Sequence, residues 1–102
     1  FRVDGLTVGI NDNQLLENSF TAFPNPVING KLNINFMLDD EANNASLFVT
    51  SIIGQQVKEV FNGSLNNDPY QFEINTDDLS AGVYFITLRT ETRNITKKVI
   101  IQ

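Results

Sequence analysis

The sequence predicts an all-β domain, a sandwich of about seven short antiparallel strands. Short segments in which apolar and polar residues alternate recur along the chain, and this is the pattern of half-buried strands. Turn-forming residues separate these segments at intervals of roughly 10 residues, a spacing typical of sandwiches and barrels. No segment between these turns has room for a helix of ordinary length.

The predicted strands follow one another from residue 20 onward. A short first strand is expected near Phe20 to Phe23, and the second strand, from Lys31, places one set of apolar side chains on a single face: Leu32, Ile34, Phe36 and Leu38. A polar turn is expected over residues 39–44. The remaining strands are expected at 45–52, 56–63, 70–74, 82–90 and 95–101. The breaks between them are Gly54 and the polar stretches 62–69, 75–82 and 91–94.

The segment AFPNPVINGKLNINF, residues 22–36, places two prolines shortly before the second strand. Each proline lacks a backbone donor and biases the residue before it, Phe23 or Asn25, toward extended geometry. Residues 27–30 can then turn the chain into the alternating strand. These local properties predict a rigid entry into the β-domain, and they require no ligand.

The composition excludes several classes of function. The chain of 102 residues has the length of one domain. Its net charge of −5 gives no basic surface for nucleic acid, and no apolar run approaches the ~20 residues of a membrane-spanning helix. Cysteine and histidine are absent, which removes thiolate sites and the Ser-His and Cys-His catalytic pairs. We expect no nucleic-acid partner, no cofactor and no enzyme activity.

Carboxylates are frequent enough to be weighed as a metal or catalytic site. They cluster at Asp39 to Glu41 and at Asp77 and Asp78. A calcium loop needs ligands at alternating positions followed by glycine, and the segment DDEANN lacks that spacing. Glycoside hydrolysis needs two carboxylates at a fixed separation, whereas adjacent carboxylates in a strand or tight turn diverge. We therefore predict neither kind of site.

The first 19 residues differ from the remainder of the chain. The chain starts at Phe1 and has no methionine before Met37, from which we expect the C-terminal piece of a longer protein. Residues 2–8 read as the end of a strand of a preceding domain, and residues 9–19 form a polar connector, unless a short helix starts at Asn13. We predict a tail and linker over residues 1–19 and one β-domain over residues 20–102.

Four short motifs follow one another in that β-domain: FPNPV at 23–27, SIIGQQV at 51–57, LSAGVYFITL at 79–88 and TKKVIIQ at 96–102. Their order and intervals resemble those of the type IX secretion system C-terminal sorting domain, type A, of the Por secretion system family. Ser51 departs from the family, which often has an acidic residue there. The residues that the resemblance marks for recognition are Pro24, Asn25, Pro26, Gly54, Gly82, Tyr84, Lys97, Lys98, Val99 and Ile100.

The resemblance implies an Ig-like β-sandwich that acts as a non-catalytic secretion signal at the end of a larger cargo protein. Shuttle proteins and an outer-membrane translocon recognise such a domain after the cargo has reached the periplasm of a Gram-negative bacterium. A sortase-like peptidase at the cell surface often removes it. The expected location is therefore secreted or at the cell surface.

The same motifs also have structural interpretations. Gly82 is expected to supply a backbone angle or a close approach where its strand begins, and Tyr84 is expected in the core. Gly54 is expected in a hairpin turn. Lys98 is predicted to point away from a core face formed by Val99 and Ile101, although Lys97 and Lys98 also form the one basic cluster near Gln102.

Two other functions remain open at this point. The alternative is a carbohydrate-binding or adhesive Ig-like module of a secreted enzyme, but such surfaces usually present exposed aromatic side chains. This chain has no Trp and two Tyr, and most of its eight Phe fit the core alternation. A passive spacer is the third possibility, because fold does not determine function. A sorting signal must lie at the extreme C-terminus of its parent protein, whereas the other two need not.

Overall fold

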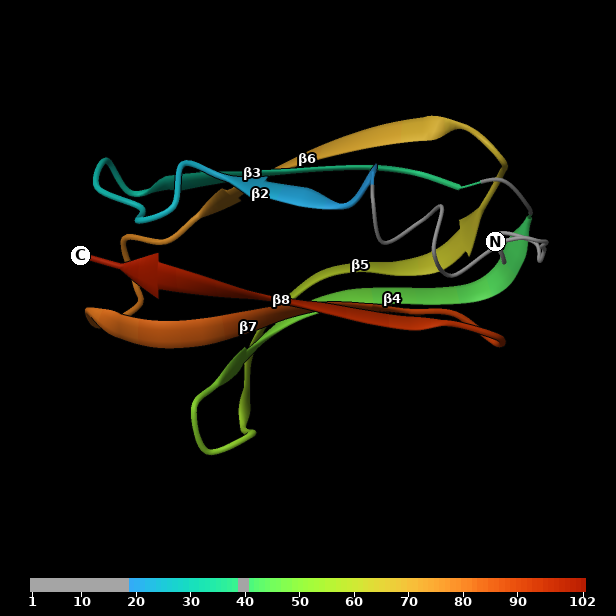
Figure 1. The fold of residues 1–102 in the computed structure, drawn as a ribbon. Helices are drawn as coiled ribbons and strands as arrows, with labels where there is room; N and C mark the ends of the chain where they lie inside the picture. Colours follow the sequence, from blue (N-terminus) through green and yellow to red (C-terminus); the bar gives the residue numbers. More distant parts are fainter. Residues whose placement is uncertain (1–18, 39–40) are drawn as a thin grey trace, which may run out of the picture.

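A computed structural model describes residues 19–38 and 41–102, which form two antiparallel sheets packed face to face (Figure 1). The three-stranded sheet has the order β2-β3-β6, with β2 at Thr21–Phe23, β3 at Lys31–Met37 and β6 at Pro69–Asn75. The four-stranded sheet has the order β5-β4-β7-β8, with β4 at Ala42–Ser51, β5 at Gln56–Leu65, β7 at Gly82–Arg89 and β8 at Asn94–Ile101. The prediction of an all-β sandwich of about seven strands is confirmed.

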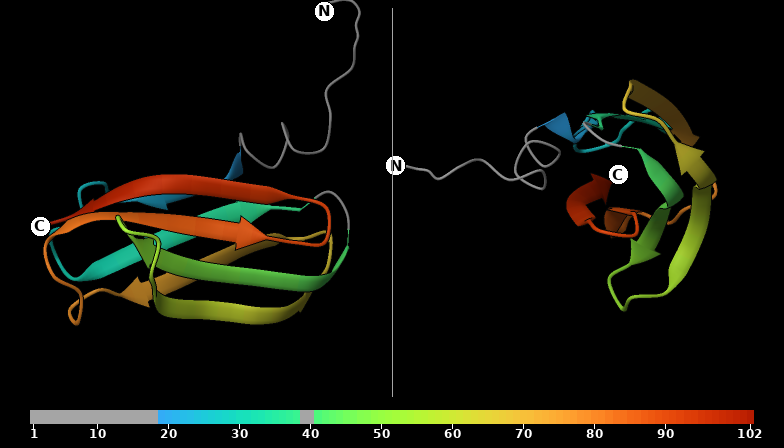
Figure 2. Two further views of the ribbon diagram at one scale, coloured as in Figure 1. Left: turned by 90° about the horizontal axis from the view of Figure 1, so that it is seen from below. Right: turned by 90° about the vertical axis from the view of Figure 1, so that its right-hand side faces the viewer.

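The expectations for residues 1–18 lie outside the described residues, as do those for Asp39 and Asp40. In the described part of the chain, no helix is long and apolar enough to cross a membrane. Figure 2, on the left, shows the four-stranded sheet from below, with β8, β7, β4 and β5 following one another across it.

The core lies between the two sheets and follows the predicted alternation. The apolar face expected for β3 is buried, and it packs against the inner face of the four-stranded sheet. The ring of Phe36 lies 5.9 Å from that of Phe20 and 6.0 Å from that of Phe72 (centroid to centroid). Burial of these apolar side chains away from water is the main force that stabilises such a sandwich. From the four-stranded sheet the core receives Ala42, Ala45, Leu47, Val49, Leu65, Tyr84, Ile86, Leu88, Ile95, Val99 and Ile101.

Two predicted turns are shorter than expected. Strand β4 already begins at Ala42, and strand β5 continues to Leu65, so the expected turn at 39–44 and break at 62–69 were too long. The reason is that Ala42 and Leu65 lie opposite each other and are both buried in the core. Burial of this pair extends the two strands, although the asparagines around it are typical of loops.

The two glycines of the motifs differ in their conformations. Gly54 has φ = +87°, and its N–H donates to the carbonyl of Ser51 at 2.9 Å, which confirms the hairpin turn. Gly82 has φ = +154°, and no atom lies within 4 Å of the position that a Cβ would take. Of the two expectations for Gly82, the unusual backbone angle is therefore the one that applies, and not a close approach.

Candidate functional site

The Pro-Asn-Pro motif lies against the C-terminal strand, although more than seventy residues separate them in sequence. The side-chain amide of Asn25 donates from Nδ2 to the carbonyl of Lys98 at 3.2 Å. Its Oδ1 accepts the N–H of Ile100 at 3.0 Å. These two backbone groups point away from β7, where a further strand would bond to them. The side chain of Asn25 therefore takes the place of a strand partner at the free edge of β8.

The residues after Asn25 continue this contact. The N–H of Val27 donates to the carbonyl of Ile100 at 2.7 Å, and the N–H of Gln102 donates to the carbonyl of Val27 at 2.9 Å. Val27 is buried and forms a parallel bridge with Ile101. We call this region, residues 25–27 bonded to residues 98–102, the capped edge. The predicted rigid entry into the β-domain thus also binds the end of the chain.

The two prolines lie on the outside of the capped edge. Pro24 and Pro26 are exposed, and each follows a cis peptide bond. Neither has an N–H that would need a partner, so Asn25 and Val27 supply the polar contacts of the segment.

The two lysines of the terminal motif point in opposite directions. Lys97 lies opposite Ile86, which is fully buried, so its half-buried side chain starts on the core face of β8. Lys98 lies opposite Phe85 and is exposed on the outer face, as predicted. The expectation that Lys97 and Lys98 act as one basic cluster therefore does not match their placement on the strand, because neighbouring residues of a strand face opposite sides.

Both edge strands of the four-stranded sheet carry such an inward lysine. On β5, Lys58 lies opposite the buried Val49, and its Nζ contacts Asp78 Oδ2 at 3.1 Å. This hydrogen bond from Lys58 holds the pKa of the Asp78 carboxyl below its usual value. Inward charges on edge strands prevent sheets from pairing edge to edge. Lys97 and Lys58 thus sit where they protect the two edges of this sheet.

The Gly-x-Tyr motif belongs to the core. Tyr84 is buried opposite Val99, and its hydroxyl donates to the carbonyl of Ser80 at 2.7 Å. Gly82 starts β7 opposite Ile101. Because Tyr84 and Val99 are covered in the folded domain, their contribution there is to packing, as the structural interpretation of Tyr84 predicted.

All four motifs meet at one end of the sandwich. Ser51, where the second motif begins, lies opposite Tyr84 of the third motif, which lies opposite Val99 of the fourth. The capped edge then adds the first motif beyond β8. In Figure 1 the start of β7, the end of β8 and the β4–β5 hairpin lie toward the same side of the molecule. The sequence contains the four motifs in order, but their order alone does not indicate that they lie side by side.

Comparison with known families agrees with this arrangement. The family described as secretion system C-terminal sorting domain matches residues 21–102, which is more than half of the chain. The chain belongs to this family. No curated relative matches it. A domain of this family is a C-terminal sorting signal of type IX secretion and not a catalytic domain, and it implies export to the cell surface or beyond in Gram-negative bacteria.

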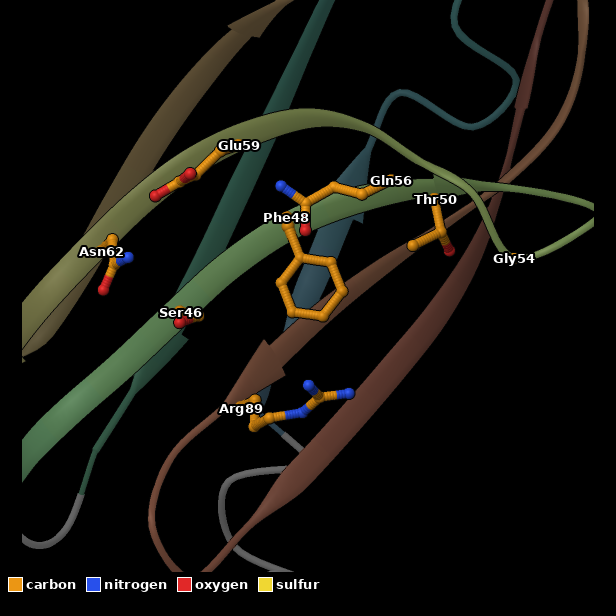
Figure 3. A pocket seen from close by; sticks show the side chains of 8 residues that line it. All are labelled: Ser46, Phe48, Thr50, Gly54, Gln56, Glu59, Asn62 and Arg89. Carbon is orange, nitrogen blue, oxygen red and sulfur yellow. The ribbon is translucent and has the colours of Figure 1, made fainter.

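In the described part of the sorting domain, an open hollow lies on the outer face of the four-stranded sheet, and no sequence motif predicted it. The hollow measures about 370 Å³, and Figure 3 shows the ring of Phe48 beside Arg89 within it. The Arg89 guanidinium carbon lies 5.2 Å from the centre of that ring, and Phe48 is only 9% exposed. The ring is therefore covered by a cation and does not form the open aromatic platform of a sugar-binding surface. The other lining residues are Ser46, Thr50, Gly54, Gln56, Glu59 and Asn62.

Two acidic side chains of the sorting domain, Asp78 and Glu91, form hydrogen bonds with residues of other segments. Within residues 19–38 and 41–102, no group of three or more metal-ligating side chains exists. Asp78 bonds Lys58, as described above. Glu91 Oε2 accepts the N–H of Asn43 at 2.8 Å, and bonds from its own backbone and from Asn43 lower the pKa of this carboxyl. Glu91 thereby joins the β7–β8 turn to the start of β4.

Proposed function

We propose that residues 20–102 form a non-catalytic secretion signal that directs a larger cargo across the outer membrane through the type IX translocon. Residues 1–19 would then be the tail of the cargo and the linker to the signal. Family membership supports this function, because the family model covers residues 21–102. The observation that carries it is the meeting of the four family motifs at one end of the sandwich, with the terminal strand fixed by Asn25.

The recognition residues divide by exposure in this proposal. Shuttle proteins and the translocon would contact the exposed members of the set in the periplasm and at the outer membrane, whereas the buried members hold the shape that is recognised. Gly82 and Lys97 are half-buried, and Tyr84 and Val99 are buried. The exposed members are Pro24, Asn25, Pro26, Gly54, Lys98 and Ile100.

The proposal includes removal of the domain at the cell surface. A sortase-like peptidase would cut within residues 9–19, because polar connectors are accessible to proteases and paired strands are not. N-terminal sequencing of the released domain tests this step. A first residue inside any strand of the sandwich would contradict it.

A fusion tests the function itself. Residues 20–102 are joined behind a signal peptide and a reporter and are expressed in a host that has the type IX system. We expect the reporter at the cell surface or in the medium, and no export in a mutant of the same host that lacks the translocon. A fusion that is folded and intact but stays in the periplasm would contradict the proposal.

A further inference from the structure

The β4–β5 hairpin carries two adjacent isoleucines at its tip. Ile52 is 69% exposed and Ile53 is 82% exposed, more than any other large apolar residue in the described part of the chain. In Figure 1 this hairpin projects below the two sheets, and the right-hand view of Figure 2 shows the same. We call residues 52–54 the hairpin tip. Val57, on the returning strand, adds a third partly exposed apolar side chain.

The fold does not require isoleucine at these positions. The turn is closed by the backbone, where Ser51 N–H donates to Gln55 O at 2.8 Å and Gly54 N–H donates to Ser51 O at 2.9 Å. Gly54 supplies the positive φ that the turn needs. Turns favour small and polar residues, and exposed apolar side chains add nothing to the core. The hairpin tip therefore holds two apolar side chains in a fixed position and away from the domain.

Three kinds of surface could cover the hairpin tip, and two of them fit poorly. A membrane would need basic residues beside the apolar ones, but residues 50–57 carry no charge and the chain has a net charge of −5. A stable dimer buries about 800 Å² on each partner, far more than two side chains at a turn supply. A pocket in a folded partner protein needs only a small, rigid apolar insert of this kind.

We propose that Ile52 and Ile53 insert into an apolar pocket of a protein of the export machinery. This inference rests on the proposed function as a sorting signal. The position of the tip supports it, because Ser51 at the base of the turn lies opposite Tyr84, in the end of the sandwich where the motifs meet. The pocket thus contacts the hairpin tip beside the exposed members of the motif set.

The test compares two double variants of the full chain carrying the signal peptide and reporter. In the first, Ile52→Ser and Ile53→Ser remove both tip side chains. In the second, Ile28→Ser and Met37→Ser remove two apolar side chains that are 62% and 48% exposed elsewhere. We expect both proteins to melt as the wild type does. Export should fall on the order of tenfold or more in the first variant only.

A binding measurement accompanies the export assay. The purified chain is titrated against the purified translocon of the host with its shuttle protein, and Ile52→Ser with Ile53→Ser should weaken binding on the order of tenfold or more. Ile52→Leu with Ile53→Leu should restore binding, since leucine is also apolar and of the same volume.

The outcomes separate this inference from the proposed function. Normal export and binding of the tip variant, beside normal export of the wild type, overturn the inference and leave the function intact. Loss of export in the Ile28 and Met37 control also overturns it, because the effect would then not belong to the tip. Tip-dependent binding to vesicles of phosphatidylethanolamine and phosphatidylglycerol, or a tip-dependent dimer in light scattering, assigns the tip to lipid or to a second copy instead. Failure of the unmodified fusion to be exported overturns the proposed function, and the inference with it.

Discussion

The capped edge and the hairpin tip lie at the same end of the sorting domain but differ in what they do for the fold. At the capped edge, Asn25 and Val27 make four hydrogen bonds to the end of the chain, and Val27 is buried. At the hairpin tip, Ile52 and Ile53 are the most exposed large apolar residues that the structure describes. The comparison teaches that the family motifs combine two tasks. Some motif residues fix the terminal strand, and others are available to a partner.

Tyr84 lies between the two regions, and its loss should affect both. The Tyr84→Ala variant leaves a cavity where the ring is buried and should lower the free energy of unfolding by about 3 kcal/mol or more. Tyr84→Phe is the matched control, which removes only the hydroxyl bond to Ser80 and should cost about 1 kcal/mol. Urea unfolding measures both. Equal stability of the alanine variant and the wild type would mean that the ring is not part of the core.

Asn25→Ala should loosen the capped edge and leave the hairpin tip unchanged. The variant leaves the carbonyl of Lys98 and the N–H of Ile100 without their side-chain partner, and we expect the free energy of unfolding to fall by about 1 to 2 kcal/mol. Hydrogen exchange should show faster exchange of the Ile100 amide, with the amides of Gly54 and Gln55 unaffected. In Asn25→Asp, the carboxylate can accept the N–H of Ile100 but cannot donate to the carbonyl of Lys98. The stability of this variant should therefore lie between those of the wild type and Asn25→Ala. Unchanged exchange at Ile100 in Asn25→Ala would refute the cap.

Local sequence patterns predicted the core but not the capped edge. Alternation correctly placed Leu32, Ile34 and Phe36, because a strand has a fixed period of two. The same period also predicts that Lys97, two residues before the buried Val99, lies on the core face of β8, which does not agree with one basic cluster of Lys97 and Lys98. No feature of the neighbouring sequence predicts the contact of Asn25 with β8, because the two prolines by themselves explain an extended segment. Its partners are set by how the two sheets pack, and the sequence of residues 22–36 does not specify that packing.

Lys97→Glu and Lys98→Glu compare the two faces of β8. Lys97→Glu places a carboxylate beside the buried Ile86. Because the glutamate side chain is shorter than that of lysine, its charge reaches water less easily, and the free energy of unfolding should fall by about 1 kcal/mol. Glutamate at 98 replaces an exposed charge and should change the free energy of unfolding by less than ~0.5 kcal/mol. If the translocon or its shuttle reads charge on this strand, Lys98→Glu melts normally and reduces export of the reporter. Normal melting together with full export would make Lys98 an edge charge without a part in recognition.

The smallest effects are expected at the two carboxylates whose pKa values are lowered in the folded state, Asp78 and Glu91. A carboxyl whose folded pKa lies below its unfolded pKa stabilises the fold above the unfolded value, and this contribution is lost as the pH falls through the folded value. Asp78→Asn and Glu91→Gln should therefore each be slightly less stable than the wild type at pH 7. Both should approach it in stability as the pH falls below the unfolded value of about 4.

Added salt should distinguish these two carboxylates, because one contacts a charged group and the other a neutral backbone donor. Asp78 pairs with the ammonium group of Lys58, so its contribution should shrink when about 1 M salt reduces the screening length to about 3 Å. Glu91 accepts the backbone N–H of Asn43, a contact between a charge and a neutral donor, and its contribution should persist in the same salt. Thermal melting of both variants at pH 7, with and without salt, measures the difference. Equal salt sensitivity would show that the field of the whole acidic chain, and not the individual partner, determines the effect of each carboxylate.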